Sequence, residues 1–129
     1  MRTQLALIVV VTMFSAGLSA HHSRAHYAKE EKTSKGTVLE YKWRNPHVVV
    51  VWEVKEDDGK VRQWVGEMAS VTSMIGDGMT KDSLKTGDEI IVISFPSMTG
   101  SPETLIKKIT KPNGTVVVDN SRAPNLRQP

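Results

Sequence analysis

Apolar and polar side chains alternate over residues 37–43, where Thr37, Leu39, Tyr41 and Trp43 share one face. A repeat of two residues is typical of a strand with one buried face, so a strand is predicted from residue 34 to residue 43. The Arg-Asn-Pro-His sequence that follows interrupts this strand, because proline has no backbone N–H to offer a sheet ladder. These four residues are therefore predicted to form a turn.

Further strands are bounded by turn residues. The Asp57-Asp58-Gly59 sequence predicts a hairpin, because glycine adopts a positive φ at no steric cost. The strands predicted around and after this turn cover residues 48–55, 60–68, 89–95, 105–110 and 115–118. Before residue 89 the apolar repeat changes to three and four residues, at Val71, Met74 and Ile75, which predicts a short helix capped by Ser70.

The order of these elements indicates the fold class. Three strands, one short helix and two or three further strands follow the order of the OB-fold, a small Greek-key barrel. We therefore predict a mainly β protein, a small OB-like barrel of five to six strands with one short helix between strands 3 and 4. A plain α+β arrangement and a β-sandwich are the alternatives.

The first twenty residues have the pattern of a secretory signal peptide. Arg2 is the only charge among them, residues 5–14 are apolar, and residues 15–20 are mostly small. An apolar core of about ten residues suits a signal peptide, whereas a membrane-spanning helix needs about 20. We expect cleavage after Ser19 or Ala20 and a periplasmic location for the mature protein.

The rest of the chain divides into three predicted segments. Residues 21–33 form a polar arm that contains histidines, and Tyr27 is the arm residue expected to dock on the domain. Residues 34–118 form the OB-like β-barrel domain. Residues 119–129 contain no aromatic residue and are predicted to be a disordered tail.

Composition narrows the classes of partner. The net charge of +3 falls to +2 once Arg2 is removed, which does not favour nucleic acid. The chain has no cysteine, so the mature protein has neither disulfides nor a lipid-modified cysteine, and no membrane association is expected. An unknown small ligand or a periplasmic protein is the expected partner.

Several motifs resemble those of a bacterial family of small exported proteins of unknown function. The His-His-Ser sequence at residues 21–23 follows the signal peptide, and an Asn-Pro-His turn lies at residues 45–47. The Gly-Thr-Val sequence at residues 36–38 and the Lys-Asp-Ser-Leu-Lys-Thr-Gly-Asp sequence at residues 81–88 are also similar. The resemblance covers most of residues 21–118, and it implies an exported protein with a small β fold.

The histidines are the candidate metal ligands. Imidazole is the commonest metal ligand in proteins and suits Zn²⁺ and Cu²⁺. The predicted metal-binding residues are His21, His22, His26 and His47, with copper as the candidate metal and no cofactor otherwise indicated. Simple solvation of histidines on a polar arm is the alternative.

The cleavage position gives this cluster a more specific meaning. Cleavage after Ala20 makes His21 the amino-terminal residue, whose amine and ring nitrogen can chelate Cu²⁺, with His47 as a third ligand. Cleavage after Ser19 instead places His22 third in the chain. The amine, two amide nitrogens and the imidazole then form a square-planar site of the kind that Cu²⁺ and Ni²⁺ adopt.

The turn between the first two strands is the candidate ligand-binding site, because OB-folds commonly bind ligands at this loop. The predicted ligand-binding residues are Trp43, Arg44, Asn45 and His47. Turn formation alone is the alternative reason for these residue types. Tyr41, Trp43, Trp52 and Trp64 either stack on a ligand or, as we favour, fill the core, with Trp43 as the expected exception.

The chain lacks the common catalytic motifs, namely the Gly-x-Ser-x-Gly elbow, the phosphate-binding glycine loop and His-Glu-x-x-His. Glu53 and Glu67 have no feature in the sequence that separates them from surface carboxylates. The sequence therefore favours a periplasmic, non-catalytic binding or interaction module. A copper or nickel carrier that uses the amino-terminal histidines with His47 is the alternative function.

Overall fold

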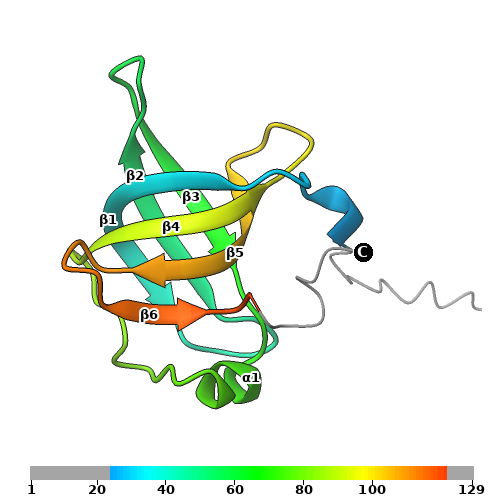
Figure 1. Ribbon diagram of the computed structural model, residues 1–129, viewed down its shortest axis with the longest axis vertical. Coiled ribbons are helices and arrows are strands. Elements are labelled where there is room, and N and C mark those ends of the chain that lie inside the picture. The colour runs from blue at the N-terminus through cyan, green and yellow to red at the C-terminus, as the bar shows by residue number, and fades with distance from the viewer. Residues whose placement is uncertain (1–23, 122–129) are drawn as a thin grey trace, which may run out of the picture.

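Six strands and one short α-helix make up the part of the computed structural model that can be described, residues 24–121 (Figure 1). The elements in chain order are the 3₁₀ turn η1 (Arg24–His26), β1 (Lys32–Lys42), β2 (Val49–Lys55), β3 (Val61–Glu67), α1 (Val71–Gly76), β4 (Glu89–Pro96), β5 (Glu103–Thr110) and β6 (Val116–Asp119). No helix in residues 24–121 has the length and apolar character needed to cross a membrane.

The strands close into a barrel. Their order in the sheet is β3-β2-β1-β4-β5-β6, and β3 also pairs with β5. This additional pairing is parallel and joins Val65, Gly66 and Glu67 to the start of β5, which closes five strands into a ring. The last strand, β6, pairs with the other end of β5. The predicted OB-like barrel, with its short helix between the third and fourth strands, is confirmed.

Strand β1 is long enough to pair with two neighbouring strands. Its first half pairs with β4 and its second half with β2, and Gly36 is paired on both sides. A Cβ atom at Gly36 would lie 2.0 Å from the backbone oxygen of Glu53, so this crossing of the strands needs a residue without a side chain. A register shift between Val38 and Glu40 then bends the strand around the barrel.

The barrel encloses one main hydrophobic core. Its fully buried members include Trp52, Val50, Ile90 and Ile106, and the indole N–H of Trp52 donates to the hydroxyl of Ser34 at 3.3 Å. The prediction that tryptophans fill the core is right for Trp52. The other aromatic residues singled out above, which are Tyr41, Trp43 and Trp64, are half-buried and pack against this core.

Helix α1 lies at one end of the barrel (Figure 1). Ser70 caps it as predicted, because its hydroxyl accepts a hydrogen bond from the Ser73 N–H. The prediction of a common buried face is wrong for Ile75, which is 60% exposed. The helix has only six residues, and the turn after it brings Met79 back so that its N–H donates to the Met74 carbonyl. Met74 and Met79 together occupy the core.

The amino-terminal arm packs along the barrel. Tyr27 is 8% exposed and contacts Phe95 and Leu105, so the prediction that this residue docks is confirmed. The Ala28 N–H donates to the Pro96 carbonyl, and the Met98 N–H donates to the His26 carbonyl. The arm thereby continues the pairing of β1 with β4 beyond the end of the strand.

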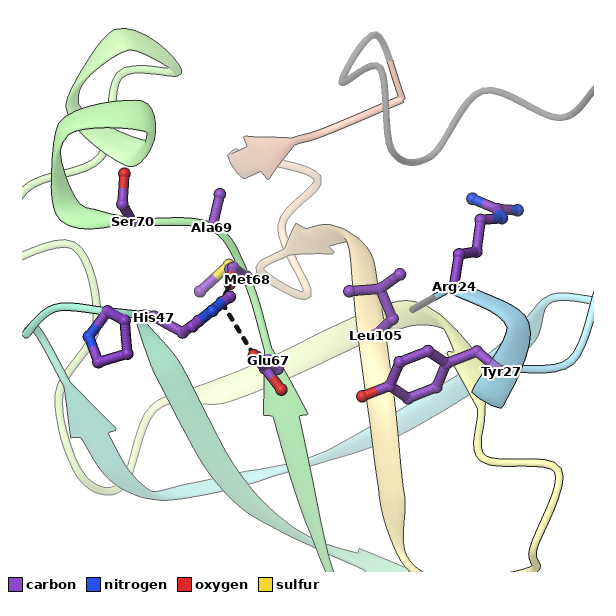
Figure 2. Close-up of a pocket in the computed structure, with 9 residues that line it drawn as sticks. Arg24, Tyr27, His47, Glu67, Met68, Ala69, Ser70 and Leu105 are labelled. Carbon is purple, nitrogen blue, oxygen red and sulfur yellow. Dashed lines mark hydrogen bonds and ion pairs between the residues drawn. The ribbon is translucent and has the colours of Figure 1, made fainter. Parts of the chain in front are cut away.

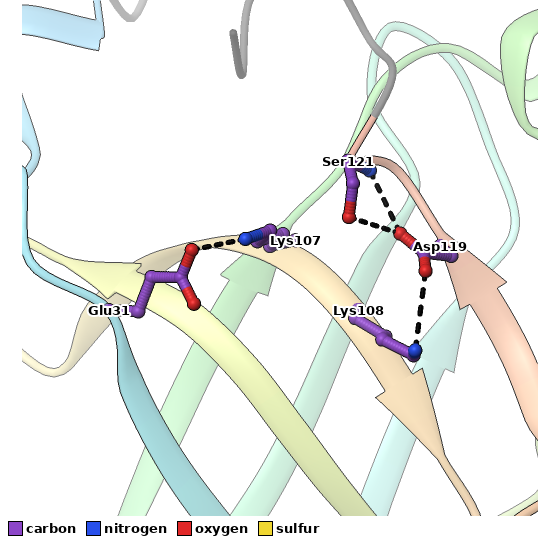
Figure 3. A network of polar contacts seen from close by, with 5 residues as sticks. All are labelled: Glu31, Lys107, Lys108, Asp119 and Ser121. Carbon is purple, nitrogen blue, oxygen red and sulfur yellow. Dashed lines mark hydrogen bonds and ion pairs between the residues drawn. The ribbon is translucent and has the colours of Figure 1, made fainter. Parts of the chain in front are cut away.

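Ion pairs tie the arm and the last strand to β5 (Figure 3). Lys107 pairs with Glu31 of the arm, and Lys108 Nζ lies 3.3 Å from the carboxylate of Asp119 in β6. Hydrogen bonds from the hydroxyl and the backbone N–H of Ser121 are the main cause that lowers the pKa of Asp119, and the nearby Lys108 lowers it further. Of the tail predicted at residues 119–129, Asp119 lies in β6, and residues 122–129 lie outside the described part.

Candidate binding site

The hairpin of β2 and β3 positions His47. The turn is centred on Asp58, so residues equally distant from it face each other, as Val49 faces Glu67. Pairing continues past the strand ends, where the Val48 N–H donates to the Ala69 carbonyl and the Met68 N–H donates to the Val48 carbonyl, both at 2.9 Å. His47 is thereby held beside the chain that follows β3.

The imidazole of His47 is anchored through one nitrogen. Its Nδ1 lies 2.8 Å from Oε1 of Glu67 and 2.9 Å from the carbonyl oxygen of Met68. A carbonyl oxygen can only accept a hydrogen bond, so Nδ1 must carry the proton. The other ring nitrogen, Nε2, is consequently the basic atom of the neutral ring. The side chains of His47 and Glu67 are 42% and 19% exposed, so the pair lies at the surface but is partly shielded.

The turn before His47 is attached to α1. The side-chain oxygen of Asn45 accepts a hydrogen bond from the Val71 N–H at 3.0 Å, and the Asn45–Pro46 peptide bond is cis. The Val71 N–H is one of the helix N–H groups that have no partner within the helix. Asn45 therefore links the turn to the helix. This is a structural role, and the turn interpretation of the sequence predicted for Asn45 only that it helps to form the turn.

A pocket of about 230 Å³ opens beside His47 (Figure 2). The barrel contributes Pro46, His47, Glu67, Met68, Ala69, Ser70 and Leu105, and the arm contributes Arg24 and Tyr27. Figure 2 shows the hydroxyl of Tyr27 pointing toward Glu67, whereas Arg24 lies at the opposite end from His47. The Arg24 guanidinium carbon is 4.5 Å from the centre of the Phe95 ring. The docked arm thus forms one wall of the pocket.

The electrostatic environment of the pocket is reflected in Tyr27. Burial is the largest cause that raises the pKa of its phenol, and the negative charges of Glu67 and Glu103 add to it. Each effect disfavours a negative phenolate. Tyr27 therefore stays protonated and can donate a hydrogen bond into the pocket.

The structure separates the predicted ligand-binding residues. His47 lines the pocket, while Trp43, Arg44 and Asn45 do not. Trp43 is half-buried with its ring centre 5.9 Å from that of Tyr41, Arg44 is exposed, and Asn45 bonds to α1.

The predicted metal ligands are also separated. His26 is exposed in η1 and does not line the pocket of His47. His21 and His22 lie outside the described residues. Within residues 24–121, no three side chains of the histidine, cysteine, aspartate and glutamate types come together to hold a metal ion.

Sequence reasoning missed Glu67 as a site residue, along with Arg24 and Leu105. The signal for Glu67 was present in the hairpin, because a turn centred on Asp58 places residue 67 opposite residue 49 and so beside His47. No comparable signal existed for Leu105. It reaches the pocket only because β5 pairs in parallel with β3.

Fold and site together define a small β-barrel domain with a histidine and a carboxylate in a pocket beside its amino-terminal arm. Residues 8–106 match a family described as "Family of unknown function (DUF6152)". The chain belongs to this family, which agrees with the predicted membership of a family without known function. Comparisons with curated proteins and with solved structures give no match.

Proposed function

We propose that this chain is an exported, non-catalytic binding module of the periplasm, and that its ligand binds in the pocket beside His47. The signal-like residues 1–20 and the His-His-Ser and Asn-Pro-His motifs support the exported location. The ligand is a small molecule or ion, or a group presented by a periplasmic protein.

The observation that carries this proposal is the convergence of separate segments on one pocket. The arm, the turn at residues 45–47, the end of β3 and the start of β5 all contribute to its wall. The wall combines apolar surface with the polar atoms of His47, Glu67 and Tyr27. Such a combination, in which a few polar groups orient a ligand on an apolar surface, is typical of small-ligand sites.

The test is a titration of the ¹⁵N-labelled exported protein with single probes, followed by amide chemical shifts. The probes are Zn²⁺, phosphate, acetate and glucose. A ligand of the proposed site shifts the amides of His47, Ala69 and Leu105, and the shifts disappear in His47→Ala. His26→Ala is the matched control, because His26 is exposed outside this pocket. Shifts confined to other faces of the barrel, or the same response in His47→Ala, contradict the proposal.

A copper or nickel carrier is the second candidate function. The anchored Nδ1 of His47 favours it, because metal-binding histidines usually donate their other ring N–H to a carboxylate or carbonyl. The amino-terminal ligands, namely His21 or His22 with the free amine, would complete the site.

The carrier is tested by copper titration with electron paramagnetic resonance on the exported protein, whose first residue is determined by amino-terminal sequencing. Wild type should bind Cu²⁺ more tightly than a free peptide of the same arm. His21→Ala and His47→Ala should each change the copper spectrum, and His26→Ala should not. Equal affinity of protein and peptide would show that the barrel contributes nothing to the metal site.

A further inference from the structure

We propose that the first half of β3 is an interaction surface, which binds an acidic, extended segment of a partner protein as an added strand. This surface, the β3 edge, consists of residues 60–64 together with Gly100 and Pro102 of the loop before β5. It shares no lining residue with the pocket of His47. Binding at the β3 edge is therefore independent of the ligand that fills that pocket.

Backbone hydrogen bonds show which residues of β3 face away from β2. The Val65 N–H donates to the Pro102 carbonyl at 2.9 Å, on the side opposite β2. The Lys60 carbonyl instead accepts a hydrogen bond at 2.8 Å from the first residue after β2. Because the hydrogen-bonding direction alternates from residue to residue in such a strand, Val61 and Gln63 share the direction of Val65. Their backbone N–H and C=O groups therefore point away from β2.

Strand β5 covers only the second half of this side of β3. The parallel pairing joins β5 to Val65, Gly66 and Glu67 and does not extend to earlier residues of β3. Among residues 24–121, no strand pairs with Val61 or Gln63 on the side away from β2. Figure 1 shows the β2–β3 hairpin extending beyond the closed part of the barrel. Extended peptides add as a further strand to backbone groups that are left open in this way.

A hollow of about 370 Å³ lies along the β3 edge and offers apolar contact as well. Val61 is 63% exposed there, and the half-buried ring of Trp64 also lines the hollow. Two contacts hold this ring in place, because its indole N–H donates to Glu56 at 3.1 Å and Lys32 Nζ lies 4.7 Å from the ring centre. A fixed aromatic side chain beside open backbone groups suits a binding surface, since such residues often dominate binding energy.

Charge indicates the kind of partner. Lys60 and Arg62 line the hollow and are exposed, and none of the described residues that line it carries a carboxylate. This favours an acidic segment. A second copy of this chain is disfavoured, because antiparallel pairing of two copies along residues 60–63 would set Arg62 directly opposite a lysine or arginine of the second copy. Like charges in that position destabilise strand pairing.

The experiment follows hydrogen exchange of the β3 amides in the ¹⁵N-labelled protein while synthetic peptides are added. The acidic probe is Thr-Val-Glu-Val-Glu-Val-Thr with both ends capped, and its counterpart carries Lys in place of Glu. In the free protein, the amides of Val61 and Gln63 should exchange quickly, whereas those of Arg62 and Trp64, which face β2, should exchange slowly. The acidic peptide should slow exchange at Val61 and Gln63, and the lysine peptide should not.

Three results would overturn the proposal. Slow exchange at Val61 and Gln63 in the free protein, with a dimer in sedimentation, would show that a second copy already covers the edge. Equal protection by the acidic and lysine peptides would refute the acidic partner. Failure of the acidic peptide to protect either amide at millimolar concentration would refute strand addition.

Variants separate backbone pairing from side-chain contact. Gln63→Pro removes the outward N–H without removing a hydrogen bond to β2, and it should abolish protection of Val61. Gln63→Ala keeps this N–H and is the matched control, which should bind like wild type. Arg62→Gln should weaken binding by up to about fivefold, the range of an exposed ion pair. Lys81→Gln should bind like wild type, because Lys81 is exposed outside the β3 edge.

Two methylated peptides test the same point on the wild-type protein, whatever the stability of Gln63→Pro. Each is the acidic probe with methyl groups on alternate backbone nitrogens, so that one edge of the peptide can no longer donate hydrogen bonds. One version should lose binding and the other should keep it, because an added strand pairs through one edge only. Equal behaviour of the two versions, or full binding to folded Gln63→Pro, would overturn strand addition.

Discussion

Gly66 provides a sharp test of how the barrel is packed. It lies in β3 opposite Val50 and is buried. A Cβ atom added there would lie 2.4 and 2.6 Å from two side-chain atoms of Ile106 and 2.7 Å from the ring of Trp52. All three contacts are shorter than van der Waals separation, so Gly66→Ala must displace core side chains.

The expected cost follows from two opposing terms. Overpacking of a well-packed core usually costs about 1–3 kcal/mol. Replacing glycine by alanine reduces the conformational freedom of the unfolded chain, which raises the free energy of unfolding by about 0.4–1 kcal/mol. We therefore expect Gly66→Ala to lower the free energy of unfolding by about 1–2 kcal/mol, which corresponds to roughly 1 M in the urea midpoint.

The assay is urea unfolding followed by tryptophan fluorescence, since Trp52 is fully buried. Gly76→Ala is the matched control. No atom lies within 4 Å of a Cβ at Gly76, which is the last residue of α1. Its stability should be unchanged or slightly higher, because alanine favours helices over glycine.

A double variant tests the cause. Ile106→Val removes the Cδ1 atom that a Cβ at Gly66 would approach at 2.4 Å. Alone it should cost about 0.5–1.5 kcal/mol. Combined with Gly66→Ala, it should cost less than the sum of the two single changes. Equal stability of Gly66→Ala and Gly76→Ala, or strict additivity in the double variant, would refute the packing argument.

Three further predictions concern pH and the turn. Burial raises the pKa of Tyr27 and of Tyr41 above 10.0. The stability that comes from their un-ionised forms is therefore present below pH 10 and is lost as the pH rises through the folded pKa values. Tyr27→Phe and Tyr41→Phe should each reduce this alkaline loss of stability. Asn45→Ala removes the acceptor of the Val71 N–H and should cost about 1 kcal/mol, with faster hydrogen exchange at that amide and no change at distant ones. Folding lowers the pKa of Asp119, so the stability that its carboxylate contributes is present above the unfolded pKa and is lost as the pH falls through the folded pKa. Asp119→Asn should therefore be less stable than wild type at pH 7 and equal to it in strong acid. A constant difference in stability across this pH range would contradict the reasoning.

Local chemistry explains why much of the fold could be predicted. Alternating apolar residues marked the strands, and the Asp57-Asp58-Gly59 turn fixed the β2–β3 hairpin, where Gly59 has a φ of 79°. Ser70 marked the start of the helix, because a side-chain oxygen there accepts a hydrogen bond from the Ser73 N–H. Each of these signals acts between residues close in sequence.

The site was less predictable than the fold. The sequence indicated His47 and the turn around it, but Trp43, Arg44 and Asn45 do not share its pocket. Side chains near one another in sequence diverge at a turn, and only the packing of the turn against α1 decides which of them faces the arm. The role of Glu67 required the hairpin register as well as the turn itself.

By itself, the sequence determined the β-rich character of the domain, its turns and the capped helix, because hydrophobic period, glycine conformations and capping are local properties of the chain. Only the tertiary structure decided that Glu67 and Met68 fix one nitrogen of His47 and that Arg24 and Leu105 join it in a pocket. The physical reason is that these contacts join segments far apart in the sequence. Barrel closure between β3 and β5 brings them together, and no local pattern encodes that closure.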